Sequence, residues 1–181
     1  PGECAGGALE MIENGILAAA AFVLLGAAYS DLKQFKIPNL MPALLLALYG
    51  CYVAIVGLSA FSWWHAAHFA IALIVGMALF AMKWFGGGDA KLYAAVALWF
   101  PLQKGPFLLF YVGMAGLVLA IMFMLTRRFT KGADGKKRTD RRIPYGIAIA
   151  VGAIACWLLQ APGQPTKMNV GDLDNRGLPS L

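Results

Sequence analysis

Charged residues are scarce in this chain of 181 residues, because Asp, Glu, Lys and Arg make up 13% of it against about 25% in soluble proteins. Hydrophobic residues make up 60%, and the mean hydropathy is +0.69. Between Ile37 and Met82, 46 consecutive residues carry no charged side chain. That length holds two membrane-crossing helices of about 20 residues each and a turn. Composition therefore excludes an ordinary soluble domain and indicates an integral membrane protein.

Cysteine is also rare, and several motifs of other protein classes are missing. Cys4, Cys51 and Cys156 form no Cys-x-x-Cys pair, which argues against a zinc site. No Gly-x-Ser-x-Gly sequence supports a serine protease. The net charge of +6 is spread between apolar runs and is not gathered in one basic domain. We therefore expect a lipid bilayer around the chain and no nucleic-acid partner.

Six apolar runs predict an all-α polytopic membrane protein with about six transmembrane helices. The spans must be helical, because unsatisfied backbone groups are costly in lipid and the runs lack the alternation of barrel strands. The predicted spans cover residues 14–30, 40–57, 65–83, 89–103, 105–126 and 143–161. This division predicts an N-terminal segment at 1–13, a membrane domain at 14–161 and a C-terminal tail at 162–181.

The distribution of basic residues predicts the orientation of these spans. With the N-terminus outside, 12 of the 15 Lys and Arg residues fall in inner loops, and three, Lys104, Lys167 and Arg176, fall outside. This asymmetry agrees with the positive-inside rule, and both termini then lie outside. Eight of the inner basic residues lie at 127–142. We interpret that loop as topogenic and lipid-attracting, with dedicated substrate binding as the alternative.

Two aspartates lie against apolar runs on the predicted inner face. Asp31 follows the run at 15–29, and Asp89 ends the sequence Gly86-Gly87-Gly88-Asp89 where the fourth run begins. A carboxylate at the edge of hydrocarbon is costly unless it is paired, protonated or facing water, so each is a functional-site candidate. Together they predict a carboxylate dyad that shares one proton and performs acid–base chemistry without a metal. A proton- or cation-coupled carrier that uses Asp31 and Asp89 is the alternative.

The residues around each aspartate also have a simpler structural interpretation. Glycines let another backbone approach closely, as a protease requires when it holds a substrate strand, so Gly86 and Gly88 are candidate substrate-binding positions. The alternative is a flexible turn with Asp89 as a helix N-cap. For Asp31 the alternative is an ion pair with Lys33, Lys36 or Lys91.

Helix ends predict unequal roles within the dyad. Asp31 lies at the C-terminal end of a predicted helix, where the dipole disfavours negative charge, whereas Asp89 lies at an N-terminus, where charge is favoured. We therefore expect Asp31 to hold the shared proton and Asp89 to activate water.

Two histidines raise the question of a metal site on the other face. His65 and His68 are three residues apart and could share a helix face, but no third ligand is evident in the sequence. Their neighbours Trp63 and Trp64 are typical of a membrane interface. We interpret this cluster as an interfacial anchor and expect neither a metal nor another cofactor.

Three separated motifs occur in order along the chain. They are Asp31 followed by Ile37-Pro38-Asn39, then Gly86-Gly87-Gly88-Asp89-Ala90-Lys91-Leu92, then Ile143-Pro144-Tyr145-Gly146-Ile147-Ala148. On these motifs the chain resembles the type IV prepilin peptidases, which are membrane aspartic proteases of the Gly-x-Gly-Asp class. The resemblance covers about residues 14–161.

This resemblance implies that Asp31 and Asp89 are catalytic and that Lys91 joins Gly86 and Gly88 in substrate binding. The implied substrate is a pilin precursor cleaved after glycine at the cytoplasmic face of the bacterial inner membrane, with the pilus-assembly machinery as a further partner. Nothing in the sequence matches the cysteine-rich insert that long members associate with N-methylation. The chain is therefore similar to the short forms that process Flp-type pilins.

Overall fold

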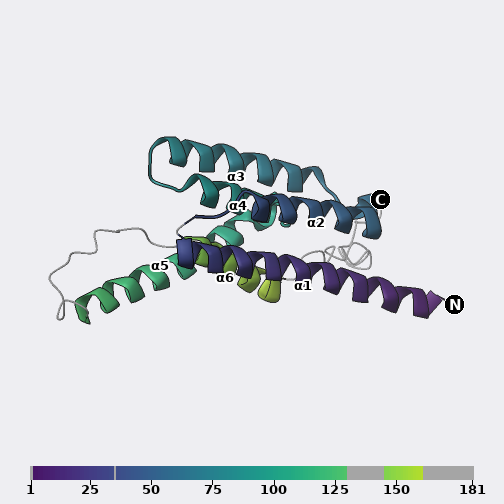
Figure 1. Cartoon of the computed structure of the whole chain (residues 1–181). Coiled ribbons are helices and arrows are strands. Elements are labelled where there is room, and N and C mark those ends of the chain that lie inside the picture. Colours follow the sequence, from purple (N-terminus) through teal and green to yellow (C-terminus); the bar gives the residue numbers. More distant parts are fainter. Residues whose placement is uncertain (1, 35, 130–144, 161–181) are drawn as a thin grey trace, which may run out of the picture.

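A computed structural model describes residues 2–34, 36–129 and 145–160, and it has no β-strand in these ranges (Figure 1). The all-α prediction is confirmed. The α-helices are α1 (Gly2–Gln34), α2 (Leu40–Val56), α3 (Trp63–Ala81), α4 (Gly87–Ala97), α5 (Gly105–Phe129) and α6 (Tyr145–Gln160). Two short 3-10 helices, η1 (Leu58–Ala60) and η2 (Leu102–Lys104), connect α2 to α3 and α4 to α5.

Helix lengths bear on how many of these elements cross a membrane. Three segments are long and apolar enough, namely Met11–Gln34, Trp63–Ala81 and Leu102–Leu125, and α2 and α6 are shorter apolar helices. Helix α4 has 11 residues and is about 17 Å long, less than a hydrocarbon core of about 30 Å. The six α-helices within the described ranges agree with the six apolar runs, whereas the exact number of crossings and the orientation stay predictions.

Two predicted boundaries were wrong. Helix α4 ends at Ala97 and does not continue to residue 103, because Pro101 lacks an N–H and disfavours helical geometry at Phe100. Helix α1 is longer than the predicted 14–30, since no proline lies between Gly2 and Gln34. Asp31 therefore lies inside the last turn of α1.

Helix α4 lies at the centre of the core and packs against α2, α3 and α6. The buried side chains of α4 are mostly small: Ala90, Leu92, Ala94, Ala95, Val96 and Ala97. A Cβ at Gly76 of α3 would lie 3.0 Å from the Ala90 Cβ, so the α3 and α4 backbones approach closely. Large apolar side chains such as Phe22, Ile74 and Leu109 are instead exposed on the outside, as expected for a surface in contact with lipid.

Packing of the remaining helices brings together the C-terminal end of α1 and the N-terminal ends of α4 and α6. Helix α1 packs against α2 and α6, and α5 packs against α6. The C-terminal end of α1 and the N-terminal end of α4 lie at the same end of the bundle (Figure 1). The start of α6 joins them through a contact to Asp31. Most of the predicted basic loop, at 130–142, and the predicted tail at 162–181 lie outside the described residues.

Candidate active site

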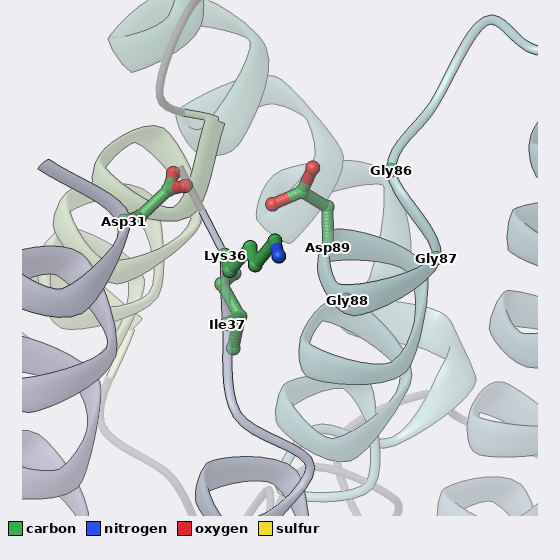
Figure 2. A pocket seen from close by; sticks show the side chains of 7 residues that line it. All are labelled: Asp31, Lys36, Ile37, Gly86, Gly87, Gly88 and Asp89. Carbon is green, nitrogen blue, oxygen red and sulfur yellow. The ribbon is translucent and has the colours of Figure 1, made fainter. Parts of the chain in front are cut away.

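Asp31 and Asp89 line one cavity of about 290 Å³, together with Lys36, Ile37, Gly86, Gly87 and Gly88. Figure 2 shows the two carboxylates in the space between α1 and α4, with the Lys36 side chain below them on the segment that runs between the two helices. The two acids are also close enough for the Asp31 charge to act electrostatically on Asp89. The structure thus brings together the two acids that the sequence singled out, although 58 residues separate them (89 − 31).

Asp31 is positioned by α6 as well as by its own helix. Its side chain is 5% exposed, and its Oδ2 accepts a hydrogen bond of 2.7 Å from the Gly146 N–H. Gly146 is the second residue of α6, where backbone N–H groups have no partner within the helix. The carboxylate therefore satisfies a donor at the α6 N-terminus, and α6 fixes its orientation.

The expected alternative for Asp31, an ion pair, is not seen in the described ranges. The Lys33 ammonium lies over the Tyr29 ring, 5.1 Å from its centroid. The Lys91 ammonium donates to Asn39 Oδ1 at 3.2 Å. Lys36 reaches the cavity from the connection between α1 and α2 and forms no ion pair with Asp31.

Asp89 lies in the first turn of α4 and is not its N-cap. The helix begins at Gly87 with Gly86 in the N-cap position, which makes Asp89 the third helical residue. The Gly86 backbone hydrogen-bonds to the Asp89 carboxylate. An acid three residues after the cap commonly satisfies the N-cap N–H in this way. The N-cap alternative was therefore wrong in position, although the carboxylate does stabilise the helix start.

The three glycines each lie against a different group of the protein itself. A Cβ at Gly86 would collide with the Asp89 carboxylate, and one at Gly87 would lie 3.2 Å from the Phe80 ring. A Cβ at Gly88 would lie 3.1 Å from the Ile37 Cβ. Gly86 and Gly88 line the cavity as expected of substrate-binding positions, and that role stays a prediction.

Lys91, also predicted to bind substrate, does not line the cavity. It is exposed, and its hydrogen bond to Asn39 ties α4 to the start of α2. The sequence suggested no site role for Ile37, Gly87 or Gly146, and it suggested Lys36 only as an ion-pair partner of Asp31. Ile37 and Gly146 belong to the family-like motifs, so the motifs did contain the signal, but apolar and glycine residues suggested no role there.

Backbone N–H groups at the site affect which of the two aspartates is expected to hold the shared proton. Asp31 accepts an N–H from the start of α6, and Asp89 accepts one from the start of α4. Both carboxylates therefore lie beside a helix N-terminus, which favours negative charge. The helix ends therefore do not by themselves distinguish the two acids, and the assignment of the shared proton to Asp31 stays a prediction.

The histidines at the other end of the bundle are engaged by backbone groups. His65 Nδ1 accepts a 3.2 Å hydrogen bond from the Ser62 N–H and completes a capping box at the start of α3. His68 is buried, with its Nδ1 2.9 Å from the Phe100 carbonyl oxygen. Within the part of the chain that the structure describes, no three His, Cys, Asp or Glu side chains are grouped to hold a metal ion.

Comparison with known families adds independent information. A sequence model described as the type IV leader peptidase family matches residues 18–121, which is more than half of the chain. The matched range contains Asp31 and the glycine motif through Asp89 and ends before α6. Comparisons with curated proteins and with solved structures gave no match.

Proposed function

The chain belongs to the type IV leader peptidase family, and from this membership we propose that Asp31 and Asp89 form the catalytic pair of an Flp-type prepilin peptidase. Membership makes it a membrane peptidase of an aspartic-type family that acts on prepilins. The proposal adds the residues, the substrate type and the membrane face. The observation that supports it best is that the two acids line a single cavity at one end of the bundle.

The proposed mechanism follows from two carboxylates that share one space. Both cannot be ionised without strong repulsion, so one holds a proton. The ionised carboxylate removes a proton from water, and the water oxygen attacks the scissile carbonyl carbon. The other carboxyl donates its proton to the carbonyl oxygen. When the tetrahedral intermediate collapses, the C–N bond breaks, the leaving amine takes the proton that the first carboxylate removed from water, and the other carboxylate regains a proton from a hydroxyl of the intermediate. No metal is required for these steps.

The site's position indicates how a membrane-anchored substrate would bind. The cavity is bounded by the ends of α1 and α4, so a pilin helix in the bilayer would present its leader junction at this end. On the predicted topology this is the cytoplasmic face of the inner membrane. The leader would stay in the cytoplasm while the mature helix stays in the bilayer, and cleavage would follow a glycine.

A cleavage assay tests this proposal. The purified full chain in detergent micelles is incubated with an Flp-type prepilin, and mass spectrometry locates the cut. We expect a single cut after the glycine at the leader junction, unchanged by a chelator such as EDTA. Absence of cleavage, together with proton or cation flux in liposomes, would favour the carrier alternative.

A further inference from the structure

Ile37 lies where three structural elements meet, on the segment that runs between α1 and α4 in Figure 2. A Cβ on Gly88 of α4 would lie 3.1 Å from the Ile37 Cβ, 3.3 Å from its carbonyl oxygen and 3.6 Å from its nitrogen. A Cβ on Gly146 of α6 would lie 3.0 Å from the Ile37 Cδ1. Ile37 therefore packs against two helix starts, each at a position where an added methyl group would force a neighbouring atom to shift.

Each of these glycines is linked to one aspartate. Gly88 directly precedes Asp89 in the first turn of α4. Gly146 donates its N–H to the Asp31 carboxylate. Ile37 therefore contacts the helix turn that carries Asp89 and also the residue whose N–H binds Asp31. Ile37 also lines the cavity between them.

The segment that carries Ile37 is itself fixed on both sides. The Ser30 hydroxyl donates to the Lys36 carbonyl oxygen at 3.0 Å, which ties the segment to α1. The Lys91 ammonium donates to Asn39 Oδ1 at 3.2 Å, which ties it to α4. With Lys36 and Asn39 held in this way, the Ile37 side chain has a defined position against both glycines.

We propose that Ile37 is a positioning residue that sets the separation of the Asp31 and Asp89 carboxylates through its contacts with Gly88 and Gly146. This inference rests on the proposed dyad. The separation matters because two carboxylates share a proton only while they are close. The coupling between their titrations also depends on this separation. A shorter side chain at residue 37 lets the α4 and α6 starts shift relative to each other.

The test uses Ile37→Ala and Ile37→Val, with Ile74→Ala as the matched control, since the exposed Ile74 lies on α3 away from the cavity. We expect Ile37→Ala to lower kcat about 10- to 100-fold, as ångström-scale misplacement of catalytic groups does, with KM changed little. The spacing between the two limbs of the pH–rate profile should also change, because the coupling between the two ionisations depends on the separation of the carboxylates.

The other titratable groups near the dyad are the same in all these variants. Lys36 lines the cavity, Lys91 is bonded to Asn39, and Tyr145 at the start of α6 contacts the Phe85 ring. A change in the spacing between the two limbs of the pH–rate profile can therefore be assigned to a change in the coupling of the two aspartates. Ile37→Val keeps the Cβ that faces Gly88 and removes the Cδ1 that faces Gly146, so it should show a smaller loss in kcat and a limb shift in the same direction.

Several outcomes would overturn the proposal. The first is a wild-type kcat and pH–rate profile in Ile37→Ala. The second is a lower amount of folded Ile37→Ala enzyme with an unchanged pH–rate profile, since this would indicate a purely structural role. If Ile37→Ala does not fold, the profile of Ile37→Val decides in the same way. Cleavage by Asp31→Asn or Asp89→Asn would instead refute the dyad itself. Inactive Asn variants beside a normal Ile37→Ala would refute the positioning role alone.

Discussion

Alanine in place of Gly146 should impair catalysis more than folding. Its Cβ would lie 2.9 Å from Asp31 Oδ2, 3.1 Å from the Asp31 Cβ and 3.0 Å from the Ile37 Cδ1. The same Oδ2 is held at 2.7 Å by the Gly146 N–H, so the carboxylate already occupies the space that the methyl group needs. Asp31 must therefore rotate away and lose this hydrogen bond.

The size of the effect follows from the hydrogen bond that is lost. A hydrogen bond to a charged group contributes about 1.5–3 kcal/mol, which corresponds to roughly 10- to 150-fold in rate if the transition state depends on it fully. We expect kcat/KM to fall within that range. Stability should change less, because alanine favours a helix over glycine by about 1 kcal/mol, which offsets part of the strain.

The assay is the initial rate of prepilin cleavage in detergent, measured beside a thermal unfolding curve. Gly113→Ala in α5 is the matched control, since a Cβ there meets no atom within 4 Å. If Gly146→Ala cleaved at the rate of Gly113→Ala and of the wild type, the idea that α6 positions Asp31 for catalysis would be refuted.

Three further predictions concern other parts of the chain. Lys91→Met removes the hydrogen bond to Asn39 and should cost about 0.5–1.5 kcal/mol in the free energy of unfolding with KM nearly unchanged; a large rise in KM for prepilin would favour the substrate-binding role that the sequence suggested. Gly152→Ala places a Cβ 2.5 Å from the Val112 Cα, so α5 and α6 must separate, and unfolding should become easier by about 1–3 kcal/mol; an unchanged melting temperature would contradict that packing. Single cysteines at 130–142 should be shielded from an impermeant thiol reagent in intact cells and cysteines near residue 164 should react, whereas the reverse labelling would invert the topology.

The helices could be predicted because hydropathy is a local property of the sequence. Apolar runs and their breaks located each of the six α-helices in the part of the chain that the structure describes. Boundaries were less accurate where one residue decides them, as at Pro101, which ends the fourth helix near Ala97. The absence of proline between Gly2 and Ile37 likewise allows α1 to include Asp31, which a hydropathy window cannot show.

The candidate site was predictable only in part. Asp31 and Asp89 could be found because an acid beside an apolar run is unusual whatever the tertiary structure. The contact between Asp31 and Gly146 spans 115 residues and depends on how α6 packs against α1, which no local pattern encodes. The sequence also could not show that the α6 N-terminus lies beside Asp31. The prediction for the shared proton therefore considered only the helix that carries each acid.

We propose above that Asp31 and Asp89 together hydrolyse the leader peptide bond. The most direct measurement is the cleavage rate of an Flp-type prepilin by Asp31→Asn and Asp89→Asn, with Glu13→Gln as the control because Glu13 lies on α1 and does not line the cavity. An amide keeps the shape of the acid but cannot exchange a proton, so each Asn variant should lose about 10²- to 10⁴-fold in rate or more while it inserts and unfolds like the wild type. Glu13→Gln should cleave normally. Substantial turnover by either Asn variant would contradict the account.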